Sequence, residues 1–201
     1  MISTFRCGVL LLSLALPCLV IVTFSAPFWY DVGFMTASSG GSKYVFGTLG
    51  YCLIEPGAHG CSKAKVGYDI SIISVIDADH PSAEIYSSLN TLTKILVLFP
   101  ITAGLVLLAF IVAIPSRHIG YGTSALIATI ACVSILSALV LELVLFGIVQ
   151  RHGNGSRNYH TNWGPSTWLT IAAFVAVFIG TILMHYGWIV ERRKRRRSYM
   201  F

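Results

Sequence analysis

The stretch GTLGYCLIEPGAHGCS, Gly47 to Ser62, places two cysteines nine positions apart on either side of a Pro56-Gly57 pair. Pro-Gly pairs are typical of turns. Aromatic and β-branched residues lead up to the first cysteine and resume after the second, as in strands that pair across a turn. The stretch therefore predicts a small antiparallel sheet. Its strands are predicted at 44–46, 49–54 and 66–72.

Outside this stretch the chain is mostly apolar. Hydrophobic residues make up 55% of the 201 residues and charged residues 11%, with a mean hydropathy of +0.76. About a quarter of the residues of a soluble domain are charged, so lipid is the predicted solvent. Four apolar segments reach the roughly 20 residues that a membrane-spanning helix needs, and a neighbouring helix can cover the carbonyl groups freed by Pro17 and Pro100. The four predicted spans are 7–26, 92–114, 124–149 and 165–190.

The first segment has a second interpretation, because Arg6 followed by an apolar run also resembles a secretory signal peptide. Its apolar core of about 18 residues exceeds the 7–15 residues usual for signal peptides, which favours a span. Cleavage would leave the orientation of the other three spans unchanged.

Lysine and arginine mark the cytoplasmic side of a membrane protein. With both termini cytoplasmic, the inner side holds eight Lys and Arg residues against one acid, and the outer side holds six against six. The inner side is thus the basic one. The segments predicted on the cytoplasmic side are too short to form an enzyme domain. We expect extracellular loops at 27–91 and 150–164, a cytoplasmic loop at 115–123 and a cytoplasmic tail at 191–201.

Cys52 and Cys61 are the only cysteines on the oxidising side in this topology, so we expect them to form a disulfide. Closing a loop of about ten residues restricts the unfolded chain by about 3 kcal/mol in the chain-entropy model. A metal site is the alternative, but two thiolates with His59 alone are poor zinc ligation. The other three cysteines fall within spans, where we expect them to act as small apolar residues: Cys7, Cys18 and Cys132.

Glu142 lies deep in the third predicted span, where a carboxylate costs about 2.5–3.5 kcal/mol on insertion scales and usually faces the bundle interior. Two interpretations stay open. The carboxyl group could be a proton-linked switch or a contact to a partner helix. It could also be a protonated group hydrogen-bonded to Thr170, Thr181 or His185, which is favoured because such interhelical bonds are common. His185 lies near the cytoplasmic end of its span, at a different depth.

Other candidates lie in the predicted outer loops. Asn154-Gly155-Ser156 is an N-glycosylation sequon on the outer side. Asp77 to His80 could bind a metal, but the helix start expected at Pro81 explains this run better. Histidine side chains titrate near neutral pH and could read it, although scattered loop histidines are usually only solvated. These histidines are His59, His80, His152 and His160.

Six consecutive cations follow the fourth span. At the cytoplasmic surface they stop transfer of the chain, and they predict binding to the anionic lipids of the inner leaflet, at about 1 kcal/mol per charge. A nucleic-acid partner is not expected beside a membrane span. The six are Arg192, Arg193, Lys194, Arg195, Arg196 and Arg197.

The plan of four spans, a long first loop with Trp29 and two cysteines resembles that of claudins. Claudins place a Trp three positions before the first cysteine, whereas Tyr51 stands directly before Cys52 here. The sequence is more similar to the fungal PalI-type family, related to the Sur-type proteins of eisosomes. The segments that carry this resemblance are GTLGYC (47–52), CSKAKVGYDI (61–70), LTKILVLFPITAGLVLLAF (92–110) and WGPSTWLTIAA (163–173).

The expected fold is therefore an all-α membrane protein, a claudin-like four-transmembrane-helix bundle with a small disulfide-stapled antiparallel β-sheet in the first extracellular loop. The resemblance implies a non-enzymatic plasma-membrane accessory protein that binds a partner membrane protein, such as the receptor of an alkaline pH-sensing complex. The alternative that it implies is an organiser of plasma-membrane domains of the Sur type. Many PalI-type members carry a long cytoplasmic tail, whereas the tail predicted here is only 191–201. We therefore expect no tail-dependent role from the resemblance. A homo-oligomer is compatible with this plan.

The sequence contains no catalytic motif, such as a nucleophile elbow, a zinc-protease motif or a phosphate-binding loop, and no cofactor is expected. A channel or transporter is a third alternative. Four helices with few polar residues offer little to line a pathway unless several copies assemble.

Overall fold

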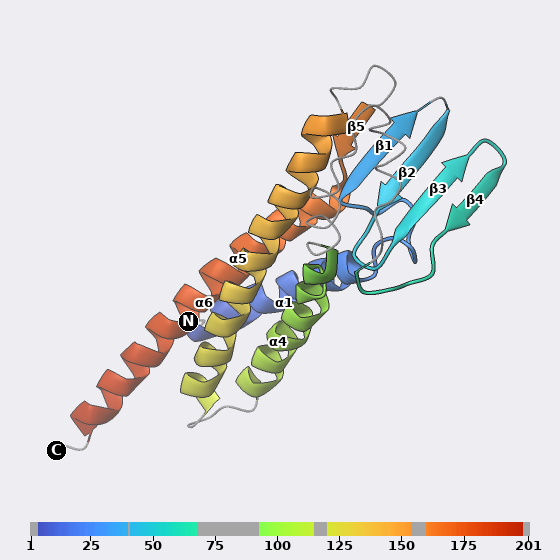
Figure 1. The fold of residues 1–201 in the computed structure, drawn as a ribbon. Coiled ribbons are helices and arrows are strands. Elements are labelled where there is room, and N and C mark those ends of the chain that lie inside the picture. The colour runs from blue at the N-terminus through green and yellow to red at the C-terminus, as the bar shows by residue number, and fades with distance from the viewer. Residues whose placement is uncertain (1–3, 40, 68–92, 115–119, 154–159, 199–201) are drawn as a thin grey trace.

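The computed structural model describes residues 4–39, 41–67, 93–114, 120–153 and 160–198, and four long helices in it form a bundle (Figure 1). In the described part of the chain, all four are long and apolar enough to cross a membrane, which confirms the predicted membrane fold. The helices are α1 (Thr4–Thr23), α4 (Leu98–Ala113), α5 (Gly120–Gly153) and α6 (Pro165–Ser198).

The bundle closes as a ring in which α1 packs on α6, α6 on α5, α5 on α4, and α4 on α1. Small residues let the helices approach closely, as is usual between spanning helices. A Cβ atom on Gly8 of α1 would lie 2.7 Å from the carbonyl oxygen of Gly180 on α6. Buried alanines line much of the remaining interior: Ala15, Ala103, Ala109, Ala128, Ala131 and Ala173.

The candidate membrane span that corresponds to the second predicted span is Thr93–Ala113, but the helix in it is interrupted. A short helical turn at 93–95 precedes α4, which begins at Leu98. Pro100 lies in the first turn of α4, where its missing N–H costs no helical hydrogen bond but interrupts any helix that would continue from before it. At the other end of the chain, α6 runs through the basic segment as far as Ser198, eight residues past the predicted span.

Five strands form one antiparallel sheet with the order β4-β3-β2-β1-β5. The fifth strand comes from the loop between α5 and α6 and pairs with β1, with Met35 opposite Trp163. The sheet therefore joins both loops, whereas the sequence predicted it in the first loop alone, and both loops lie at the same end of the bundle. The strands are β1 (Met35–Ser39), β2 (Ser42–Phe46), β3 (Tyr51–Glu55), β4 (Ala58–Cys61) and β5 (His160–Trp163).

The return strand predicted at 66–72 is wrong where it can be compared, because Val66 and Gly67 are not in a strand and 68–72 lie outside the described residues. The chain turns back earlier. Glu55 pairs with Ala58, which leaves Pro56 and Gly57 as a two-residue turn. Gly57 has a φ of +90°, the conformation that a type II turn needs at its second central residue.

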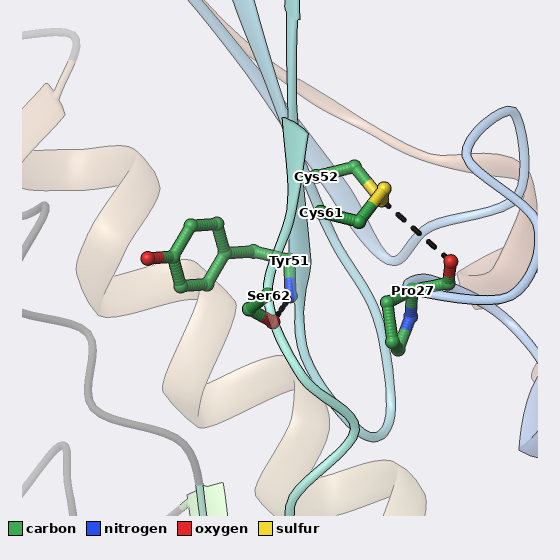
Figure 2. The surroundings of a disulfide bond; sticks show 5 residues. All are labelled: Pro27, Tyr51, Cys52, Cys61 and Ser62. Atoms are coloured by element: carbon green, nitrogen blue, oxygen red, sulfur yellow. Dashed lines mark hydrogen bonds between the residues drawn. A yellow bond between two sulfur atoms is a disulfide. The ribbon is translucent and has the colours of Figure 1, made fainter. Parts of the chain in front are cut away.

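The predicted disulfide between Cys52 and Cys61 is present and joins β3 to β4 (Figure 2). The two residues face each other in the ladder, with Cα atoms 4.0 Å apart. Beside them, Tyr51 donates its N–H to Ser62 Oγ at 3.1 Å and accepts the N–H of Ser62 at 2.9 Å. The disulfide thus links two strands that are also joined by backbone hydrogen bonds.

Candidate functional site

The sheet lies against one end of the helix bundle, and the junction between the two is the candidate functional site (Figure 1). Two hydrogen-bonded contacts and one aromatic cluster hold it. Each uses residues from segments that are distant in the sequence.

The first contact joins the GTLG segment to the end of α1. The Thr48 hydroxyl donates to the carbonyl oxygen of Val22 at 2.7 Å, and the Thr48 N–H donates to Ser25 Oγ at 2.9 Å. Both hydroxyls are buried, with their oxygens 3.1 Å apart. Gly47 makes this approach possible, since a Cβ atom there would collide with the backbone of Ala26. The Val22 carbonyl also accepts the N–H of Ser25 at 3.3 Å, so the segment adds a second donor to a carbonyl group at the end of α1.

The second contact joins the residues before β1 to the start of α6. The carbonyl oxygen of Phe34 accepts the N–H of Gly164 at 2.6 Å and the hydroxyl of Thr167 at 3.2 Å. The N–H of Ser166 donates to the carbonyl oxygen of Gly33 at 3.1 Å. A Cβ atom on Gly164 would collide with that same carbonyl group, so glycine is required by the closeness of the two backbones.

An aromatic cluster fills the space between these contacts and the helices. The ring of Phe34 lies 5.2 Å from that of Phe99 on α4 and 5.5 Å from that of Phe146 on α5, measured between centroids. All three side chains are buried, and ring pairs at such distances stabilise beyond their buried area. Phe34 therefore anchors the sheet in the bundle.

Glu142 lies one helical turn from Phe146 on α5 and is 1% exposed. The hydroxyls of Thr167 and Thr170 on α6 lie against its carboxyl group. Among the described residues, neither carboxyl oxygen has a hydrogen-bond partner at bonding distance. Of the three neighbours that the sequence offered, the structure thus places Thr170 beside Glu142.

The other two neighbours lie elsewhere in the bundle. His185 contacts Thr129 Oγ1 at 3.4 Å and the carbonyl oxygen of Thr181 at 3.0 Å. The Thr181 hydroxyl donates to the carbonyl oxygen of Val177 at 2.7 Å. The mismatch in depth between Glu142 and His185 that the sequence indicated agrees with this placement.

The remaining candidates are dispersed. His59 stacks on Tyr30, with ring centroids 5.7 Å apart, and His160 is exposed on β5. His80, Asp77, Asp79 and the sequon at Asn154 lie outside the described residues, as does the His152 side chain. The three span cysteines are free. In the described ranges, no three His, Cys, Asp or Glu side chains come together as metal ligands would.

The basic segment continues α6 as a helix. Arg192 and Arg193 are exposed, and the guanidinium of Arg192 lies 5.2 Å from the centre of the Trp188 ring. For 194–197 the structure describes the helical backbone but not the side chains.

Sequence reasoning missed Ser25, Phe34 and Thr48 as junction residues. A signal for one contact was present, because Gly47 and Gly50 bracket a threonine, and glycines at such spacing often mark a close backbone approach. The role of Phe34 had no local signal, since its partners lie 65 and 112 positions further along the chain.

Comparison with known proteins finds one relative and one family. The chain is 27% identical over 145 residues to the pH-response regulator protein palI/RIM9 of Yarrowia lipolytica (strain CLIB 122 / E 150). That match covers 69% of this chain but only 17% of the relative, so the chain spans a small part of that protein. Residues 1–180 match the SUR7/PalI family, a range that includes α1, α4, α5, the first half of α6 and both junction contacts. The chain is therefore a multi-pass membrane protein that belongs to the SUR7/PalI family.

Proposed function

We propose that this chain is a non-catalytic accessory protein of an ambient alkaline pH-response complex in the plasma membrane, where its sheet binds a partner membrane protein such as the pH receptor. The observation that carries the proposal is the sheet itself. Strands from two loops are docked on the bundle through two sets of buried hydrogen bonds. The name of the relative, a pH-response regulator, supports the pathway.

A rigid sheet is suited to recognition because ordering it costs nothing further when the partner binds. Strand β4 is exposed along its length and forms one edge of the sheet. Tyr30 stacks on His59 of β4, and the side chains of Phe28, Trp29 and Tyr30 are about half exposed. Aromatic residues of this kind are enriched at the membrane surface, so this end would contact a partner close to the lipid headgroups.

The proposed orientation places the sheet outside and both termini inside, because the inner side then carries the excess of Lys and Arg. Ala64 is exposed at the sheet end. A cysteine at Ala64 should react with a membrane-impermeant maleimide in intact cells, and a cysteine at Ser198 should react only after permeabilisation. The reverse pattern would overturn the orientation. A glycosidase-sensitive mass shift that Asn154→Gln abolishes would support it independently.

The function is tested with a chimera, because the relative is much longer than this chain. In Yarrowia lipolytica cells that lack palI/RIM9, the segment of the relative that matches this chain is replaced by this chain. We expect the chimera to restore growth at alkaline pH. The same chimera with Cys52→Ser and Cys61→Ser should not, whereas the matched control Cys18→Ala, which removes a free cysteine, should. A chimera that reaches the plasma membrane and leaves alkaline growth defective would refute the proposal.

A second candidate function is organisation of plasma-membrane domains, as the Sur-type relatives imply. The helical continuation of α6 through the basic segment supports it, since a rigid cationic helix can hold several anionic lipids at once. Imaging of the tagged protein separates the two. Stable cortical patches that persist when the pH-response pathway is deleted favour the organiser.

A further inference from the structure

Glu142 is a buried ionisable residue that the proposed partner binding does not use. Its side chain is 1% exposed, and among the described residues neither carboxyl oxygen has a hydrogen-bond partner. The polar groups against it are the hydroxyls of Thr167 and Thr170. Ser166 Oγ, on the same face of α6 as Thr170, is also buried without a partner.

The two threonine hydroxyls present the carboxyl group with acceptors. Thr167 donates its single hydroxyl proton to the carbonyl oxygen of Phe34 at 3.2 Å, and Thr170 donates to the carbonyl oxygen of Ser166 at 2.9 Å. Their oxygens therefore offer lone pairs to Glu142. A neutral carboxylic acid can donate its own proton to one of them, whereas a carboxylate would meet no donor from either. This arrangement fits the protonated form.

The surroundings of Glu142 supply no charge to balance a carboxylate. Phe146, one helical turn away on α5, belongs to an apolar cluster with Phe34 before β1, Phe99 of α4 and Val22 of α1. The residues of α6 that face it are neutral hydroxyl residues. Among the described residues, no charged side chain interacts with the carboxyl group. The nearest histidine along α6, His185, lies 15 residues beyond Thr170, about 22 Å away along the helix axis.

We propose that Glu142 is a proton-binding site whose ionisation loosens the docking of the sheet on the bundle. When Glu142 releases its proton to solvent, the carboxylate needs donors, and the Thr167 hydroxyl is one of the two polar groups that lie against it. A hydrogen bond to a charged acceptor is about twice as strong as one to a neutral carbonyl. The Thr167 O–H therefore turns from the Phe34 carbonyl to Glu142, and no covalent bond changes other than the O–H bond of the acid.

The hydrogen bond that is lost is accepted by Phe34, the residue that anchors the sheet. Phe34 keeps only the Gly164 N–H on its carbonyl oxygen, and its ring stacks on Phe146, one helical turn from Glu142 on α5. The docked state holds the proton and the loosened state releases it. The free energy of docking therefore decreases as the pH rises, because the state that binds fewer protons gains with pH.

Infrared difference spectra of the purified full chain in lipid nanodiscs test the first half of the proposal. Between acidic and alkaline buffer, the wild-type protein should lose the carbonyl stretch of a neutral carboxylic acid. Glu142→Gln, which is neutral at every pH and close in shape, should lack this band. A wild-type spectrum without the band, or the same band in Glu142→Gln, would overturn the proposal.

Hydrogen exchange tests the coupling. The protection factor of the Gly164 amide, corrected for the intrinsic pH dependence of exchange, should fall about tenfold across the same range, which corresponds to loss of one hydrogen bond. In Glu142→Gln it should stay constant. If that variant does not fold, Thr167→Val and Thr167→Ser replace it. The valine variant should show low protection at every pH, and the serine variant should titrate like the wild type. Equal pH dependence in the wild type and Thr167→Val would refute the coupling.

The physiological meaning of this site rests on the proposed function, but its test does not. A chimera that fails to restore alkaline growth while Glu142 titrates as described would refute the function alone. A chimera that restores growth both with and without Glu142→Gln would leave the function standing and show that the proton site is not its sensor.

Discussion

The hydroxyl of Thr48 donates to the backbone carbonyl of Val22 at 2.7 Å, across 26 positions of sequence. This bond joins the loop before β3 to the last turn of α1, inside a region closed to solvent. It explains why the glycine-rich GTLG segment packs on a helix end rather than forming an exposed loop. The sheet and the bundle are thus coupled through a few buried polar contacts, and most of the predictions below test that coupling.

Replacing Thr48 by valine should destabilise the protein by about 1–3 kcal/mol, because the change keeps the shape but leaves the Val22 carbonyl and Ser25 Oγ with one fewer partner each. Thermal unfolding in detergent micelles would measure this. Thr48→Ser keeps the hydroxyl and is the matched control, with an expected loss below that of valine. A Thr48→Val variant as stable as the wild type would show that the hydrogen bond does not contribute.

Removal of the disulfide by Cys52→Ser with Cys61→Ser should loosen the β3–β4 hairpin and leave the helices folded. The disulfide contributes up to about 3 kcal/mol to the free energy of unfolding for a loop of this length. Hydrogen exchange should accelerate in β3 and β4 and remain unchanged in α4 and α5, because the disulfide lies within the sheet. Exchange that accelerates throughout the bundle would contradict this local role.

Gly8→Ala should weaken the contact between α1 and α6 by about 1–3 kcal/mol, since overpacking forces two backbones apart. The added Cβ atom would lie 2.7 Å from the carbonyl oxygen of Gly180, which cannot move independently of its helix. Gly104→Ala is the control, because a Cβ atom there meets nothing within 4 Å. It should be neutral or stabilise the helix by up to about 1 kcal/mol. Thermal unfolding of both variants provides the comparison.

Neutralising 192–197 with glutamine should reduce the number of anionic lipids that remain bound to the purified protein, as counted by native mass spectrometry. Each cation near an anionic surface contributes about 1 kcal/mol, and the effect should weaken as salt is raised. Lys63→Gln with Lys65→Gln removes exposed charge at the sheet end and serves as control. Equal loss of lipid in both variants would argue against a specific role for the basic helix.

Local patterns in the sequence predicted much of the fold. The four spans follow from apolar segments of about 20 residues, since the backbone in lipid has no hydrogen-bond partner except within its own helix. The disulfide follows from the side of the membrane on which Cys52 and Cys61 are expected. The return strand was misplaced because Val66 to Ile72 alternates like a strand, whereas the Pro56-Gly57 turn had already reversed the chain.

The candidate site was less predictable. Glu142 stood out by its charge, and Thr170 was among the neighbours that helical position allowed. Thr167, the residue that connects Glu142 to Phe34, could not be identified, because its hydroxyl acts on a carbonyl 133 positions away. Strand β5 was missed for a similar reason. It is four residues long, and only its pairing with β1 makes it a strand.

The sequence by itself determined that this protein is embedded in lipid, and it determined the four helices and the disulfide. The length of an apolar segment, the residues of a turn and the position of a cysteine are all local properties. Tertiary structure alone decided that the two loops share one sheet and that Phe34 anchors it between α4 and α5. It also decided that Glu142 lies one helical turn from Phe146, which contacts that anchor, and against two hydroxyls that donate to other carbonyl groups. These features depend on backbones that approach closely only after the helices have packed, at glycines whose partners no local pattern reveals.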